Sequence, residues 1–203
     1  MTSIVSHPQR IGIRAQLRQN LTLRKLGAPY WEELEPRLEI VEYAKGSMLV
    51  TQGSADMEQF FILEGILKRV VGNSEGKEMI LRLAAETEMD TSYAAWRLHT
   101  LTPYSIVALT NCRVARLPME AWVEFLEHHD EVKEAFEYEV MRLMSEVMAH
   151  TITLHLLDAS GRLARFQRKH PELVDRIPKK ELAAYLNITP ETLSRVKIRK
   201  AAD

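Results

Sequence analysis

The spacing of apolar side chains changes along the chain and predicts an α+β protein. Residues 1–36 are helix-prone and are interrupted by Pro29 and Pro36. Between residues 38 and 118, short apolar runs are separated by glycines, which is typical of the strands of a sandwich or jelly roll. The predicted strands are residues 38–43, 48–51, 59–63, 66–71, 78–83, 105–109 and 113–117, with a hairpin turn at Asn73-Ser74-Glu75-Gly76.

From residue 118 onward the apolar positions follow a helical spacing. They predict a short helix at 119–126, a long helix at 131–157 and another helix at 162–170. The long helix carries apolar positions in alternating steps of four and three, as coiled coils do. We expect this seam to form a homodimer interface made of Phe136, Val140, Leu143, Val147, His150 and Leu154. Packing of the seam on the chain's own barrel is the alternative.

Two further features of the long helix carry expectations. Met141, Met144 and Met148 form a second stripe, which we expect to pack on the chain's own barrel. His150 is the one polar member of the seam, and in a parallel dimer it would face its own copy. Protonation would then place like charges together, so the dimer should weaken as the pH falls.

Residues 177–196 predict two short helices joined by a tight turn. Leu182 and Leu186 share one helical face. Asn187 tolerates the left-handed conformation that such a turn needs, and Thr189 is a good helix cap. This is the pattern of a helix-turn-helix, whose second helix enters the major groove of DNA. A surface hairpin with a solvated charged face is the alternative.

Side chains of the second helix are suited to reading bases. Glu191, Ser194 and Arg195 share one face, and these side chains can bond cytosine or guanine edges. We expect a second set to hold phosphates without reading sequence, namely Thr189, Thr192, Lys179, Lys180, Lys197 and Arg199.

The charge distribution supports a DNA-facing end. Residues 161–203 hold eleven Lys or Arg against five Asp or Glu, a net charge of +6, whereas the rest of the chain carries −7. Apolar runs are too short for a membrane span, and the N-terminus lacks the apolar core of a signal peptide. We therefore expect a cytoplasmic protein without a membrane partner.

The segment from Leu182 to Arg195 resembles the DNA-reading motif of the cyclic-AMP receptor protein/Fnr family of bacterial transcription regulators. Its Glu-x-x-Ser-Arg triplet is similar to the base-reading residues of the Fnr branch. Phe60–Gly65 and Gly76-Lys77-Glu78 resemble the core of the family's cyclic-nucleotide-binding barrel. The resemblance implies a jelly-roll sensor domain at 1–130, a dimerisation helix at 131–157 and a helix-turn-helix domain at 158–203. Between His170 and Pro178 there is no room for the β-hairpin wing of the family.

The sensor region departs from the family pattern. The phosphate cassette of relatives corresponds to residues 87–93, which contain no glycine, and Thr102-Pro103 stand where a phosphate-binding Arg-Ser pair is needed. We therefore do not expect cyclic AMP as the effector. The region either fills its own pocket or binds an apolar or uncharged molecule. The candidate pocket residues are Met89, Tyr93, Trp96, Arg97 and Tyr104.

Cofactor and enzyme chemistry find no support in the sequence. Cys112 is the only cysteine, so a cysteine-held iron–sulfur cluster is excluded. The barrel region contains only His99, which is too few histidines for a cupin metal site. No catalytic motif occurs. We predict no catalytic residue, no metal and no cofactor.

The sequence as a whole predicts a homodimeric regulator that binds double-stranded DNA at a palindromic operator. RNA polymerase is a candidate further partner, and the small-molecule effector is unassigned. Two alternatives stay open. One is a ligand-independent regulator controlled by its abundance or by a protein partner, and the other is a small-molecule-binding protein that does not bind DNA.

Overall fold

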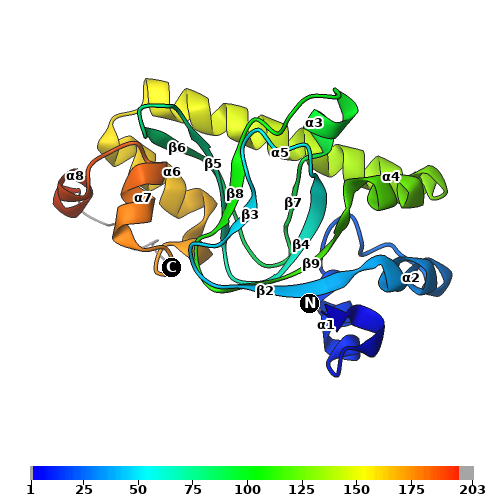
Figure 1. The fold of residues 1–203 in the computed structure, drawn as a ribbon. Coiled ribbons are helices and arrows are strands. Elements are labelled where there is room, and N and C mark those ends of the chain that lie inside the picture. The colour runs from blue at the N-terminus through cyan, green and yellow to red at the C-terminus, as the bar shows by residue number, and fades with distance from the viewer. Residues whose placement is uncertain (1, 197–203) are drawn as a thin grey trace.

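Two antiparallel sheets form a barrel at the centre of the computed structural model, which describes residues 2–196 (Figure 1). One sheet has the order β1-β2-β9-β4-β7 and the other β3-β8-β5-β6. The strands are β1 (Thr2–Ser3), β2 (Glu39–Tyr43), β3 (Met48–Val50), β4 (Glu58–Glu64), β5 (Leu67–Gly72), β6 (Glu78–Ala84), β7 (Met89–Thr91), β8 (Ser105–Ala108) and β9 (Cys112–Pro118). The expected jelly roll and all seven predicted strands are confirmed, while β1 and β7 were not predicted.

Helices lie at both ends of the barrel and along one side of it (Figure 1). The helices are α1 (Arg10–Leu17), α2 (Ala28–Leu34), α3 (Tyr93–Arg97), α4 (Met119–Glu127), α5 (Asp130–Leu156), α6 (Ala159–Lys169), α7 (Lys179–Tyr185) and α8 (Pro190–Arg195), with short 3₁₀ turns η1 (Ile4–Ser6), η2 (Glu35–Arg37) and η3 (Pro171–Leu173). No strand follows β9 in residues 2–196, so the helix-turn-helix lacks a β-wing, as predicted. Within the same residues, no helix is both long enough and apolar enough to cross a membrane.

Two turns show how local sequence shapes the barrel. In the predicted hairpin between β5 and β6, the side chain of Asn73 accepts from the backbone N–H groups of Glu75 and Lys77, and Gly76 has a φ of +78°. Between β4 and β5, Gly65 has a φ of +92°, and a Cβ there would lie 2.3 Å from the carbonyl oxygen of Asn111. Only glycine fits this close approach of two chain segments.

The long helix α5 packs its predicted seam against its own chain. Phe136 is fully buried in an aromatic cluster, with ring centroids 4.9 Å from Tyr93 and 5.3 Å from Trp122. Leu143 is also buried in this core, and Val140 packs against it. The prediction that Phe136 and Leu143 line a dimer interface is therefore wrong, because the barrel already covers their apolar surface, whereas Val140 is half-buried.

The methionines of α5 lie on the opposite side from the one predicted. Met141, Met144 and Met148 are 63%, 52% and 61% exposed, so they do not pack on the barrel. They continue an exposed apolar face that also includes Tyr138, Ile152 and Leu156. We call these six residues the α5 outer face. A continuous exposed apolar strip of this kind is typical of protein interaction surfaces.

The C-terminal module, residues 158–196, packs on the four-stranded sheet of the barrel. One hydrophobic cluster joins barrel residues such as Ile80 and Leu83 to Phe166, Leu182 and Tyr185 of the module. Two ion pairs flank this contact. Lys68 Nζ lies 2.7 Å from Glu181 Oε2, and Arg176 Nη2 lies 2.6 Å from Glu86 Oε1. The module therefore has a defined orientation relative to the barrel.

Candidate nucleic-acid interface and sensor core

The turn between α7 and α8 is built by Asn187. Its φ of +51° is left-handed, which Asn adopts more readily than most residues. The N–H of Ile188 then donates to the carbonyl of Ala183 at 3.0 Å, which closes the end of α7. Ala183 is 1% exposed, so the second helix crosses where a larger side chain would not fit.

Helix α8 is fixed at its start and on one face. The Thr189 hydroxyl accepts from the N–H of Thr192 at 3.2 Å, and Pro190 occupies the first turn, where no N–H is required. Leu193 is 4% exposed and packs in the cluster shared with the barrel. The helix is therefore held by one apolar anchor and one cap, and its other face is free.

The three predicted base-reading residues lie on this free face. Glu191, Ser194 and Arg195 are all exposed. Ser194 donates its hydroxyl to the carbonyl of Pro190 at 2.9 Å, which leaves the oxygen able to accept. Bonding to its own backbone N–H and to the Thr189 hydroxyl lowers the pKa of Glu191, so the side chain is a carboxylate that can only accept.

The predicted phosphate contacts are distributed around the two helices. Lys179 and Lys180 are exposed at the start of α7, Thr189 is exposed, and Thr192 is half-buried. Lys197 and Arg199 lie outside the described residues.

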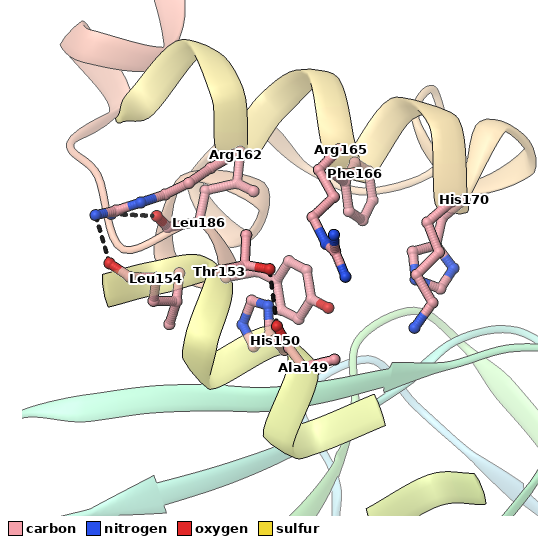
Figure 2. Close-up of a pocket in the computed structure, with 11 residues that line it drawn as sticks. Ala149, His150, Thr153, Leu154, Arg162, Arg165, Phe166, His170 and Leu186 are labelled. Atoms are coloured by element: carbon pink, nitrogen blue, oxygen red, sulfur yellow. Dashed lines mark hydrogen bonds between the residues drawn. The ribbon is translucent and has the colours of Figure 1, made fainter. Parts of the chain in front are cut away.

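Arg162 ties the long helix to this turn, a role that the sequence did not reveal. Its guanidinium donates to the carbonyls of Leu154 at 2.6 Å and Leu157 at 2.8 Å at the end of α5. It also donates to the carbonyls of Leu186 at 3.0 Å and Asn187 at 3.2 Å, just before α8. Figure 2 shows its bonds to Leu154 and Leu186. The position of the turn between α7 and α8 is thus linked directly to the end of α5.

His150 faces the C-terminal module of its own chain. Its ring stacks on Tyr185 of α7, with centroids 4.0 Å apart and planes only 4° apart. The prediction that His150 sits in a dimer seam is therefore wrong. Burial, together with the nearby Lys169 and His170, lowers the pKa of His150 to about 4. Val147 and Leu154, the remaining members of the predicted seam, are half-buried on the same helix.

A buried cluster of charges occupies the sensor core of the barrel. Arg69 and Arg82 are direct cross-strand partners on β5 and β6, and both are almost fully buried. Asp90 of β7 lies between them, forming an ion pair with Arg69 and lying 3.4 Å from Arg82 Nη1. Asp90 is 0% exposed, and its carboxylate compensates two guanidinium groups that would otherwise repel each other.

Tyr104 completes this core. The Arg69 guanidinium lies 4.0 Å from the centre of its ring, and the Tyr104 hydroxyl donates to the carbonyl of Thr91 at 2.8 Å. Burial lowers the pKa of Arg69, but the neighbouring Asp90 more than offsets this and raises it overall. Arg69 therefore stays charged inside the barrel.

The five predicted pocket residues do not form one pocket. Met89 and Tyr93 are buried in the aromatic core beside α5, and Trp96 packs on Tyr93. Tyr104 belongs to a different cluster, and Arg97 is exposed. Thr102 hydrogen-bonds the carbonyl of Ser54 at 3.1 Å, so its hydroxyl has a structural partner. In the described part of the chain, no group of three or more His, Cys, Asp or Glu could hold a metal.

The sequence contained one signal of the buried arginines. Arg69 stands two residues after Leu67, so both point to the same face of β5, and that face is apolar. An arginine at an inward position needs a buried acid. Which acid it meets depends on strand pairing that the local sequence does not specify.

Comparisons with known proteins agree with this architecture. The cyclic nucleotide-binding domain family matches residues 40–129. No curated protein matches the chain. Among solved structures, a Crp/Fnr-family regulator from Eubacterium rectale is similar with a TM-score of 0.70 and 15% identity, over 87% of this chain and 84% of that one.

Two further structures give the same result. The c-di-GMP-responsive regulator CLP of Xanthomonas campestris has a TM-score of 0.68 and 13% identity, over 83% of this chain and 89% of that one. FixK2 of Bradyrhizobium japonicum has a TM-score of 0.65 and 16% identity, over 78% and 81% of the two chains. Residues 40–129 thus match the cyclic nucleotide-binding domain model, and the chain has the fold that is seen in Crp/Fnr transcription regulators.

Proposed function

We propose that this protein is a sequence-specific DNA-binding regulator of transcription. The observation that carries the proposal is the exposed face of α8, where Glu191, Ser194 and Arg195 stand together on a capped and anchored helix. Arg195 would bond guanine, Glu191 would accept from cytosine, and Ser194 would adapt to either. The solved structures of similar fold are transcription regulators, which supports the same reading.

The proposed phosphate contacts surround this face. Lys179 and Lys180 at the start of α7, together with Thr189 and Thr192, would hold the DNA backbone on either side of the groove. Lys197 and Arg199 follow α8 directly in sequence and belong to the same proposal. The net charge of +6 on residues 161–203 would supply the salt-dependent part of the affinity.

We infer that the active form is a homodimer whose interface is the α5 outer face. Tyr138, Met141, Met148 and Ile152 follow one another in steps of three, seven and four, which keeps them along one line of the helix. Two copies related by a two-fold axis would bury this strip. The recognition helices would then address half-sites about 34 Å apart, or a multiple of this, in a palindromic operator.

The sensor core favours a regulator that does not respond to cyclic AMP. Arg69, Asp90 and Tyr104 fill the interior of the barrel with their own ion pair and ring contact. A phosphate would have to compete with Asp90 for Arg69. This observation gives weight to the alternative of a regulator that needs no ligand in its barrel.

Selection of bound sequences from random duplex DNA, followed by a gel shift on the selected operator, tests the DNA-binding proposal. Arg195→Ala should weaken operator binding by about 1–3 kcal/mol per site, with a smaller loss on random DNA. Arg97→Ala is the matched control, because Arg97 is an equally exposed cation on α3. Equal losses for the two variants, or no selected sequence at all, would refute base reading by Arg195.

A further inference from the structure

A small cavity lies where the long helix meets the C-terminal module (Figure 2). Its volume of about 30 Å³ is sufficient for about two water-sized groups. The polar side chains that line it are His150 and Thr153 from α5, Arg162, Arg165 and Lys169 from α6, His170 and Tyr185. No acidic side chain is among its lining residues. The permanent charges of the lining are therefore all positive, while the nearest acids, Glu146 and Glu88, lie outside the lining and act on Tyr185 and His170.

The basic groups differ in how far they are compensated. Arg162 is fully engaged with four backbone carbonyls. Lys169 Nζ lies 3.4 Å from Glu146 Oε1, outside the cavity lining. Arg165 is exposed and has no hydrogen bond and no ion pair within residues 2–196, and Figure 2 shows it extending from α6 toward α5. Its guanidinium is therefore a cation available to a ligand.

The two histidines add donors whose own partners are missing or weak. The Nε2 atom of His150 is buried without a hydrogen bond of good geometry among the described residues, although the backbone of Ile80 and of Tyr185 lies close enough to the ring to oppose part of the lowering of its pKa. Burial lowers the pKa of His170, with a further contribution from Lys169. Both rings are thus neutral at physiological pH, and each can donate one N–H to an acceptor.

We propose that this cavity binds the carboxylate group of a small molecule. A carboxylate has the size of the hollow, and its two oxygens match the paired donors of a guanidinium. Arg165 would form the charged pair, and His150 would donate to the same group. The remainder of the molecule would extend through the open side of the cavity toward solvent.

Binding at this position would influence the C-terminal module. The carboxylate would contact α5 through His150 and α6 through Arg165, so it would fix the angle between the two helices. Arg162 already links the end of α5 to the turn between α7 and α8. A ligand here would therefore stabilise one orientation of α8 without occupying the barrel. This goes beyond the proposed DNA binding and does not depend on it.

An NMR titration of the full chain with sodium acetate tests the proposal, with sodium chloride at equal ionic strength as the reference. Acetate should shift the imidazole signals of His150 and His170 and raise the pKa of His150, because a bound anion favours the imidazolium. Arg165→Gln should weaken acetate binding about tenfold or more, and Arg165→Lys should lose less. The matched control is Arg168→Gln, since Arg168 is an exposed residue of the same helix outside the cavity lining.

Three results would overturn the proposal. Acetate could shift the histidines no more than chloride does, or Arg165→Gln could bind acetate as tightly as Arg168→Gln. Inorganic phosphate could bind where acetate does not, which would contradict a carboxylate site. The titration contains no DNA, so its failure is distinguishable from a failure of the DNA-binding proposal.

Discussion

Acidification should loosen the C-terminal module through His150. The ring is stacked between α5 and α7, and its pKa is lowered from 6.5 to about 4, first by burial and then by Lys169 and His170. Arg165 on α6 and Tyr185 on α7 also face it, and the pKa of Tyr185 is raised by burial, so neither supplies a compensating negative charge. Protonation of His150 is therefore opposed in the packed structure.

The sign and size of the effect follow from linkage. A base whose pKa is lowered in the folded state binds its proton more readily after release, so folding stability is complete above about pH 6.5 and falls as the pH decreases toward about 4. At about pH 5.5 the loss attributable to His150 is about 1.3 kcal/mol, and it reaches about 3 kcal/mol below about pH 4. His170, whose pKa is also lowered, acts in the same direction.

Urea unfolding at about pH 7.5 and about pH 5.5, in buffers without carboxylates, measures this loss. The variant His150→Phe keeps an aromatic ring on Tyr185 and cannot be protonated. It should lose about 1.3 kcal/mol less than the wild type between the two pH values. His155→Phe is the control, because His155 is an exposed residue of the same helix. Equal losses in His150→Phe and wild type would refute the reasoning, as would an NMR-measured pKa of His150 near 6.5.

Three further predictions concern the dimer and the sensor core. Met148→Glu should shift the protein toward monomer in analytical ultracentrifugation. Met48→Glu should not, because Met48 is an exposed methionine of β3 outside the α5 outer face. A dimer that persists in both variants would place the interface elsewhere. Asp90→Asn should destabilise the protein by about 3–5 kcal/mol in urea unfolding, against less than about 0.5 kcal/mol for the exposed Asp56→Asn, because the buried Arg69 loses its acid and Arg82 keeps only Glu88 and Glu146. Calorimetry should detect no micromolar binding of cyclic AMP, since Thr102 and Pro103 stand where a phosphate-binding pair is needed and the buried Arg69 is already paired with Asp90.

Local sequence determined most of the elements. Strands β4, β5 and β6 are short apolar runs that end or begin near Gly65, Gly72 and Gly76, and α6 and α8 begin with side-chain caps from Asp158 and Thr189, so these features depend on residues close in the chain. The helix-turn-helix is the clearest case. Asn187 supplies the left-handed turn, Thr189 the cap and Ala183 the close crossing, all within a span that can be read directly.

Tertiary structure decided which side of α5 faces the barrel. Phe136, Leu143 and Met148 all belong to apolar stripes with helical spacing. Such a stripe can be buried equally well against a barrel or against a partner helix. The sequence therefore predicted the helix and inverted its faces. The rotation of α5 is set by the aromatic contacts of Phe136 with Tyr93 and Trp122, which come from distant parts of the chain.

The sensor core likewise required the fold. Arg69, Arg82 and Asp90 lie on three different strands. They meet because β5 pairs with β6 in one sheet, and β7 is an edge strand of the other sheet. His150 and Tyr185 meet in the same way, across α5 and α7, which are separated in the sequence by α6 and η3. Strand register and helix docking are set by long-range packing. The sequence therefore determined the elements and the recognition helix, and only the packing of those elements decided which buried charges and rings face each other.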